Sequence, residues 1–135
     1  MTRAARAMLW LPALLAAGCE QLPNLPPTAS FIYSPISPIY AGETAVVFNA
    51  SGSRDSDGQV VSYVWDFGDG TAQLTANGPT VTHVFPDTDK RCLEITYTAL
   101  LTVLDDAGEG ATASQTVKVV ELPELRSREC QPEEE

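Results

Sequence analysis

Residues 60–70 read VVSYVWDFGDG, and this stretch decides how the chain folds. Its larger apolar side chains, Val61, Tyr63, Trp65 and Phe67, alternate with their neighbours at a period of two, which is typical of a β-strand with one buried face. The closing Gly-Asp-Gly supplies the backbone freedom that a tight reversal needs. We therefore predict a core strand followed by a sharp turn. Trp65 is assigned to the core and not to sugar stacking, because its strand neighbours share its face.

Five other segments alternate in the same way. The apolar or inward positions are Ala29, Phe31 and Tyr33 in 28–34; Val46 and Phe48 in 44–50; Val81, His83 and Phe85 in 80–85; Tyr97, Ala99, Leu101 and Val103 in 95–104; and Gln115, Val117 and Val119 in 113–120. No amphipathic helix pattern follows residue 18. Short strands separated by turn residues predict an all-β antiparallel sandwich, with Phe31, Trp65, Phe67, Leu101 and Val103 in its core.

Length and charge exclude several classes of protein. A chain of 135 residues has room for one domain, and 44% hydrophobic residues argue against disorder throughout. Eighteen acidic residues against eight basic ones give a net charge of −10, which disfavours a nucleic-acid partner. A single histidine leaves few ways to build a His-dependent catalytic site.

The first nineteen residues have the organisation of an export signal. Arg3 and Arg6 precede an uncharged, largely apolar run at 7–17, which is too short to span a bilayer as a helix. The run ends in Leu-Ala-Ala-Gly-Cys, which resembles the lipobox of bacterial lipoproteins, although Ala16 stands where that motif more often has Leu. The resemblance implies cleavage before Cys19 and attachment of a lipid to its thiol. A simple secretory signal with a chance cysteine is the alternative.

The chain thus divides into a signal peptide at 1–18, a lipidated Cys19 with a proline-rich tether at 19–27, a β-sandwich at 28–121 and an acidic tail at 122–135. The processed protein would carry a charge of −12, because Arg3 and Arg6 are lost. No later stretch is apolar for long enough to span a membrane. We expect a lipid-anchored protein of the bacterial cell envelope. Glu20, and not Asp, follows the cysteine, which favours the outer membrane.

The sandwich segment resembles a PKD domain over residues 25–121. The matching motifs are PTASF at 27–31, GE at 42–43, SGS and DSDG within 51–58, YVWDFGDG at 63–70, VTHVF at 81–85, and LTV with DDAG within 101–108. The resemblance implies an immunoglobulin-like sandwich of about seven strands, used for adhesion, spacing or partner binding and not for catalysis. The stretch at 86–92 is longer than the family usually has between its fifth and sixth strands, and it bears a cysteine.

With Cys19 lipidated, Cys92 and Cys130 remain as an even pair in an exported chain. They are too far apart in sequence for a local metal knuckle. In a sandwich of this topology the last two strands form a hairpin, so that the segments carrying both cysteines lie at a common end. We predict a disulfide between them that stabilises the fold by about 4 kcal/mol in the chain-entropy model.

The resemblance also suggests a calcium site. In this topology the start of the first strand, the loop after the second and the loop after the sixth meet at one end, and some family members bind Ca²⁺ with acids in these loops. The corresponding residues here are Asn24, Asp55, Asp57, Asp105 and Asp106. Calcium prefers several carboxylate oxygens on flexible loops, and a cation would relieve the repulsion among these acids. The alternative is an ordinary polar turn at Asp-Ser-Asp-Gly.

Other polar residues are assigned structural roles. Asp66 and Asp69 are expected to accept hydrogen bonds from turn amides, and His83 to be a hydrogen-bonded structural histidine. Tyr40, in a proline-rich turn, is the better candidate for an exposed stacking residue. The Asn-Ala-Ser sequon at Asn49 is attributed to chance.

The leading hypothesis is a monomeric, non-catalytic binding or spacer module that is held on a membrane and presents its loops to a protein or glycan. The alternative is a structural component of an envelope assembly. An enzyme is the least favoured class, since nothing in the sequence marks a nucleophile beside the single histidine.

Overall fold

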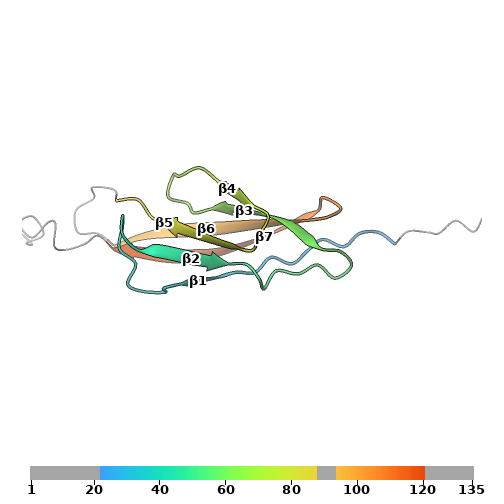
Figure 1. The fold of residues 1–135 in the computed structure, drawn as a ribbon, viewed down its shortest axis with the longest axis horizontal. Coiled ribbons are helices and arrows are strands. Elements are labelled where there is room, and N and C mark those ends of the chain that lie inside the picture. The colour runs from blue at the N-terminus through green and yellow to red at the C-terminus, as the bar shows by residue number, and fades with distance from the viewer. Residues whose placement is uncertain (1–21, 88–93, 121–135) are drawn as a thin grey trace, which may run out of the picture.

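The computed structural model describes residues 22–87 and 94–120, and these form two antiparallel sheets packed face to face (Figure 1). The strands are β1 (Ile32–Ser34), β2 (Ala45–Asn49), β3 (Val60–Asp66), β4 (Leu74–Ala76), β5 (Thr80–Val84), β6 (Glu94–Asp105) and β7 (Gly110–Val120). One sheet has the order β1-β2-β5 and the other the order β4-β3-β6-β7. The predicted all-β, seven-stranded sandwich is confirmed. Within the described part of the chain, no helix is long and apolar enough to cross a membrane.

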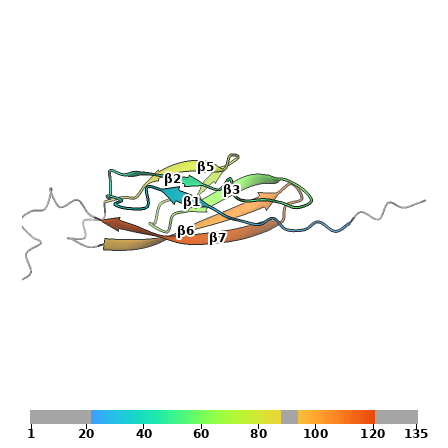
Figure 2. The same cartoon turned by 90° about the horizontal axis from the view of Figure 1, so that it is seen from below.

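The two long strands β6 and β7 form the hairpin that the sequence predicted. They pair from Glu94 opposite Val120 to Leu104 opposite Gly110, and both are longer than the alternation had indicated. β1 is conversely shorter than the predicted segment 28–34. Figure 2 shows β6 and β7 lying together along the length of the sandwich, with β1 and β2 on the other layer.

Two features of the second sheet differ from the sequence prediction. β4 has only three residues, too few to show alternation, and it was not predicted. The prediction that Val61 lies on the buried face is wrong, since its side chain is 46% exposed. A register shift between Val60 and Ser62 explains the difference, because an extra residue at a bulge interrupts the alternation, so that Val61 does not share the buried face of Tyr63 and Trp65. Val60 packs against the core in its place.

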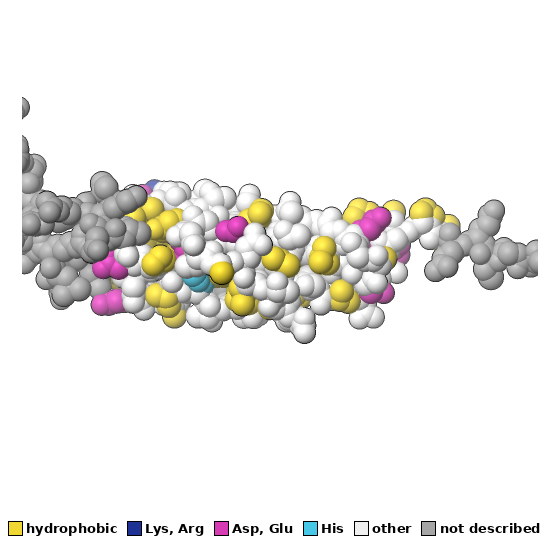
Figure 3. Space-filling view, turned by 90° about the horizontal axis from the view of Figure 1, so that it is seen from above, with side chains coloured by type: hydrophobic (Ala, Val, Ile, Leu, Met, Phe, Trp, Pro, Cys, Tyr) yellow, Lys and Arg dark blue, Asp and Glu magenta, His cyan; other side chains and the backbone are white. Residues whose placement is uncertain are grey.

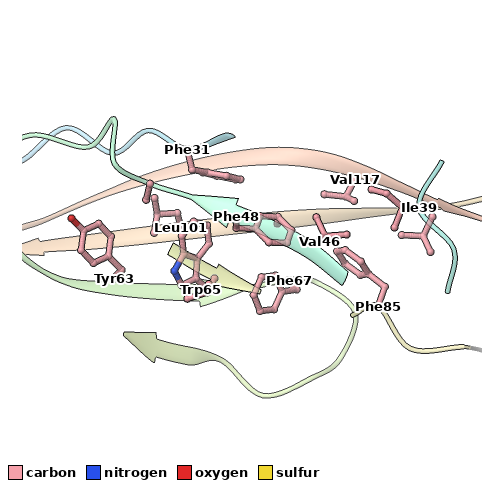
Figure 4. Packing of buried hydrophobic residues seen from close by; sticks show 14 of the residues in the cluster. Phe31, Ile39, Val46, Phe48, Tyr63, Trp65, Phe67, Phe85, Leu101 and Val117 are labelled. Atoms are coloured by element: carbon pink, nitrogen blue, oxygen red, sulfur yellow. The ribbon is translucent and has the colours of Figure 1, made fainter. Parts of the chain in front are cut away.

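The core between the two sheets combines buried aromatic rings with aliphatic side chains (Figure 4). Phe48 lies at its centre, with ring centroids 5.0 Å from Phe67, 5.7 Å from Trp65 and 6.2 Å from Phe31. All five residues predicted for the core are buried, namely Phe31, Trp65, Phe67, Leu101 and Val103. Trp65 is fully buried, and its Nε1 has no hydrogen-bond partner among the described residues. A buried ring of this kind packs against its neighbours and is not available to stack on a sugar.

The sandwich is elongated, and its two ends differ in composition. We call the end formed by residues 24–28, 50–59 and 105–110 the acidic end, because five carboxylates lie there: Asp55, Asp57, Asp105, Asp106 and Glu109. We call the opposite end, where β7 finishes and residues 35–44 connect β1 to β2, the groove end. The N-terminal segment runs along the acidic end and the last described residue lies at the groove end (Figure 1).

Candidate functional site

At the acidic end the structure brings together all five residues predicted to bind calcium. Asp105, which is almost completely buried, accepts a hydrogen bond from Asn24 Nδ2 at 2.8 Å and others from the backbone N–H groups of Ala107 and Glu109. The hydrogen bond from Asn24, together with those from the backbone amides, holds the pKa of the Asp105 carboxyl below its ordinary value. Asp105 is therefore an ionised group that is built into the turn after β6.

Two other carboxylates of the acidic end also accept hydrogen bonds from backbone amides of distant segments. Asp57 Oδ2 accepts one from the N–H of Leu25 at 3.0 Å, and Asp106 Oδ1 accepts one from the N–H of Gln59 at 3.0 Å. These contacts join three segments that are far apart in sequence. The acids thus tie the N-terminal segment and the two loops to one another.

One buried carboxylate oxygen at this end stands out in the part of the chain that the structure describes. Asp55 Oδ2 is buried and makes no hydrogen bond within the described residues. A Cβ added at Gly58 would lie 2.7 Å from that oxygen and closer still to Asp106 Oδ1, so both oxygens crowd the glycine. A buried carboxylate oxygen without a partner is costly, and a cation or a water molecule would satisfy it. Because Gly58 has no side chain, the carboxylates of Asp55 and Asp106 can lie close to its backbone, which a larger residue would prevent.

The acidic end does not by itself present a formed metal site. Among residues 22–87 and 94–120, no group of three or more His, Cys, Asp or Glu side chains is arranged so that it could hold a metal ion. Hydrogen bonds direct oxygens of Asp57, Asp105 and Asp106 toward backbone amides. The residues fit calcium in chemistry and in proximity, and calcium stays a prediction.

The turn after β3 carries a second polar cluster. Asp66 Oδ1 accepts a hydrogen bond from the N–H of Gly68, and Asp69 Oδ1 accepts one from the N–H of Thr71, which confirms both predicted roles. Asp69 Oδ2 also lies 2.6 Å from His83 Nε2, and the Asp69 side chain is fully buried. Burial opposes ionisation of Asp69, but the hydrogen bonds from Thr71 and His83 outweigh it and hold the pKa of that carboxyl below its usual range.

His83 is the hydrogen-bonded structural histidine that was predicted. Its ring stacks on Phe67 with the centroids 3.8 Å apart, and it meets Phe85 edge-on at 4.9 Å. The contact with Asp69 joins β5 of one sheet to the loop that leaves β3 of the other. The sequence indicated a partner for each residue but not that the two bond to each other, since the pairing depends on how the sheets are stacked.

A groove opens at the groove end, between residues 33–39 and the last residues of β7. It encloses about 260 Å³ and is lined by Tyr33, Ile36, Ser37, Ile39, Glu94, Thr116, Lys118 and Val120. Lys118 Nζ lies 2.8 Å from Glu94 Oε1, and Tyr33 Oη donates a hydrogen bond to the carbonyl of Thr116. Ile36 is 74% exposed. The groove therefore combines an aromatic ring, an exposed aliphatic side chain and an ion pair, and sequence analysis did not single it out.

Tyr40 does not lie in this groove. It is half-buried, its N–H donates to Thr44 Oγ1, and it forms an isolated parallel bridge with Val120. On the face seen in Figure 3, hydrophobic side chains lie scattered over the surface and acidic side chains are present at both ends.

Cys19, Cys92 and Cys130 lie outside the described residues, so the lipidation site and the disulfide stay predictions.

Comparison with known proteins identifies the fold family. The family model for the PKD domain matches residues 24–120. The chain belongs to the PKD domain family. The match begins at Asn24, the same residue at which the N-terminal segment makes its contact with Asp105. A PKD domain is a non-catalytic module.

Two relatives show where such domains occur. The chain is 40% identical over 73 residues to the pre-pro-metalloprotease PrtV of Vibrio cholerae, and 35% identical over 79 residues to the collagenase ColA of Bacillus cereus. These alignments cover 54% and 58% of this chain but only 7% of each relative. The PKD domain is thus a small part of those larger proteins.

Solved structures agree with the fold. The PKD1 domain of the Vibrio cholerae metalloprotease PrtV superimposes with a TM-score of 0.53 at 33% identity, and the match covers 70% of this chain and 98% of that one. A structure described for carbohydrate-binding modules from the β-sandwich superfamily superimposes with a TM-score of 0.64 at 38% identity, covering 73% of this chain and 36% of that one.

Proposed function

We propose that this protein is a lipid-anchored, non-catalytic PKD module of the bacterial cell envelope that binds a protein or a glycan. The observation that carries the proposal is the PKD sandwich itself, which accounts for residues 24–120 and resembles a structure of carbohydrate-binding modules at 38% identity. The export signal with its cysteine supports the anchor. The groove offers a contact surface for a partner, since it combines a tyrosine ring with a charged pair and hydroxyl groups.

The anchor is tested by replacing Cys19 with Ser. The variant should leave the membrane fraction and appear in the soluble fraction, because two or more acyl chains are needed for stable attachment. Metabolic labelling with a radioactive fatty acid should mark the wild type and not the variant. If the variant sediments with membranes as the wild type does, the lipoprotein assignment is wrong.

Binding is tested with a glycan array and with crosslinking in intact cells. Ile36→Ala and Lys118→Ala should weaken binding if the groove is the contact surface, because each removes a group that lines it. Val61→Ala, an exposed apolar residue outside the groove, serves as the matched control. Recovery of envelope proteins in fixed stoichiometry, with no detachable ligand and no effect of the groove variants, would instead favour a structural role in an assembly.

We further propose that Ca²⁺ binds at the acidic end through Asn24, Asp55, Asp57, Asp105 and Asp106. The unpartnered oxygen of Asp55 supports this, since a cation would satisfy it. Millimolar Ca²⁺, at a hundredfold excess over its dissociation constant, should stabilise the protein by about 2.7 kcal/mol relative to chelator in thermal melting. Asp55→Asn should abolish the gain, whereas Asp66→Asn, in the turn after β3, should keep it. Equal melting with and without Ca²⁺ would reject the site.

We also propose the disulfide between Cys92 and Cys130 that the sequence predicted. It is supported by the pairing of Glu94 with Val120, because these residues are the nearest described neighbours of the two segments and lie side by side. Mass spectrometry of an unreduced digest should find the linked peptides. Two free thiols in protein purified from the envelope would contradict the bond.

A further inference from the structure

The N-terminal segment is bonded into the acidic end before the first strand begins. Asn24 Nδ2 donates to Asp105 Oδ2, and the N–H of Leu25 donates to Asp57 Oδ2. Pro27 is buried, and Thr28 exchanges two backbone hydrogen bonds with Arg54, at 2.7 and 3.0 Å. From Asn24 onward the chain is therefore part of the folded body, so the few residues between Cys19 and Asn24 limit how far this body can be from Cys19.

The stretch from Cys19 to Asn24 is short compared with the domain. Cys19 precedes Asn24 by five residues, which reach at most about 18 Å even when fully extended. β6 runs nearly the whole length of the sandwich with 12 residues, a length of about 36 Å. If Cys19 carries the lipid, the acidic end cannot leave the vicinity of the bilayer.

The short link to Cys19 decides which end lies near the bilayer, and the charged and exposed apolar residues of that end define what the bilayer meets. The Lys and Arg side chains among the described residues are Arg54 at the acidic end and Lys118, which is paired with Glu94. Among residues 22–87 and 94–120, neither the long sides nor the acidic end therefore offers a basic surface to an anionic bilayer, and the short link to Cys19 is what keeps the acidic end near the lipid. Two exposed leucines, Leu22 at 88% and Leu25 at 52%, are carried by the segment at the acidic end. These side chains are available for contact with the lipid interface.

We propose that the domain stands upright, with the acidic end facing the bilayer and the groove opening at the membrane-distal end. The inference rests on the proposed lipidation of Cys19. It assigns the two ends different partners: the lipid surface for the acidic end, and the protein or glycan ligand for the groove. It also places the carboxylates where divalent cations gather at an anionic membrane.

The orientation is tested by energy transfer from the domain to the bilayer. Ser56→Cys at the acidic end and Ser37→Cys at the groove end are both exposed positions for a donor dye. The full-length lipoprotein is reconstituted in vesicles of phosphatidylethanolamine and phosphatidylglycerol that carry a headgroup acceptor. The acceptor is chosen with a transfer distance comparable to the length of the domain. Transfer should be several-fold more efficient from position 56 than from position 37, and the unmutated protein labelled in parallel gives the background from its own cysteines.

A lengthened tether provides the matched control. A flexible Gly-Ser insertion after Gln21 should leave the protein on the vesicles but bring the two efficiencies closer together, because the acidic end is then free to move away. Equal or inverted efficiencies in the protein with its natural tether, while it floats with the vesicles, would overturn the orientation and leave the anchor intact. Protein that does not float with the vesicles would contradict the anchor, and the orientation with it.

Discussion

The acidic end and the groove end of this sandwich are held together by different forces. At the acidic end, carboxylates of Asp57, Asp105 and Asp106 accept hydrogen bonds from amides of other segments. At the groove end, the ring of Phe85 packs against those of Phe67 and Tyr97, and residues 39–41 exchange backbone hydrogen bonds with Val120. Apolar packing does not depend on pH, whereas the hydrogen bonds to Asp105 favour its ionised form and lower its pKa. The two ends should therefore respond differently to mutation and to acid.

The largest expected loss of stability comes from a substitution at the groove end. Phe85 is fully buried and contacts Phe48, Phe67, His83 and Tyr97. Phe85→Ala should lower the free energy of unfolding by about 4 kcal/mol, since it removes a large apolar side chain and leaves a cavity. Denaturant unfolding followed by Trp65 fluorescence measures the change. Val84→Ala, at the half-exposed neighbour on the same strand, should cost less than about 0.5 kcal/mol, and a similar loss for both would contradict the packing argument.

The turn after β3 is the next most sensitive position. Gly68 has a φ of +71°, and a Cβ there would lie 2.5 Å from the backbone oxygen of Thr98. Gly68→Ala should therefore destabilise the fold by about 3 kcal/mol through backbone strain and a clash with a rigid partner. Gly78→Ala meets nothing within 4 Å and has no positive φ, so it should be nearly neutral. Similar unfolding midpoints for the two variants would show that this turn is not constrained as described.

Truncation of a single side chain at the acidic end should lower the free energy of unfolding by less. Asn24→Ala removes the hydrogen bond to Asp105 and should cost about 1.5 kcal/mol, a value typical of a bond to a charged group. Hydrogen exchange should also rise at Leu25, because the segment is then held by fewer bonds. Leu22→Ala, at a side chain that is almost fully exposed, is the control. An unchanged exchange rate at Leu25 in Asn24→Ala would mean that Asn24 does not hold the segment.

The smallest expected effect is in the pH dependence of stability. The pKa of Asp105 is lowered in the folded protein by the bond from Asn24 and by backbone amides. The stability it contributes is therefore present above the ordinary Asp pKa of about 3.9 and is lost as the pH falls through the lower folded value. Unfolding midpoints measured from neutral pH to about pH 2 should fall less steeply below pH 4 in Asp105→Asn than in the wild type. Parallel curves would show that this carboxylate is not responsible.

The alternation of residues predicted most of the fold because burial on one face of a strand requires a period of two. Phe31, Phe48 and Leu101 follow this rule and are buried as expected. The rule failed at Val61, where a bulge shifts the register, and at β4, which is too short to show a pattern. Both failures depend on pairing with a neighbouring strand, which local sequence does not specify.

The candidate sites also differ in whether the sequence predicted them. The acids of the loops and the turn roles of Asp66 and Asp69 were predictable from residue type and from short spacing. The groove and the Asp69–His83 pair were not, because each joins residues from different sheets or from distant loops. Such contacts arise only when the two layers stack at a particular distance and angle.

The sequence by itself determined that this is a PKD-type β-sandwich, because motif and alternation are local properties that survive without knowledge of the packing. The tertiary structure alone decided that Asn24 and Leu25 are bonded to the acids of two distant loops, and that the groove opens at the opposite end. The physical reason is that hydrogen bonds and grooves depend on distances across the whole sandwich. Those distances are set by how the sheets pack and not by any one segment.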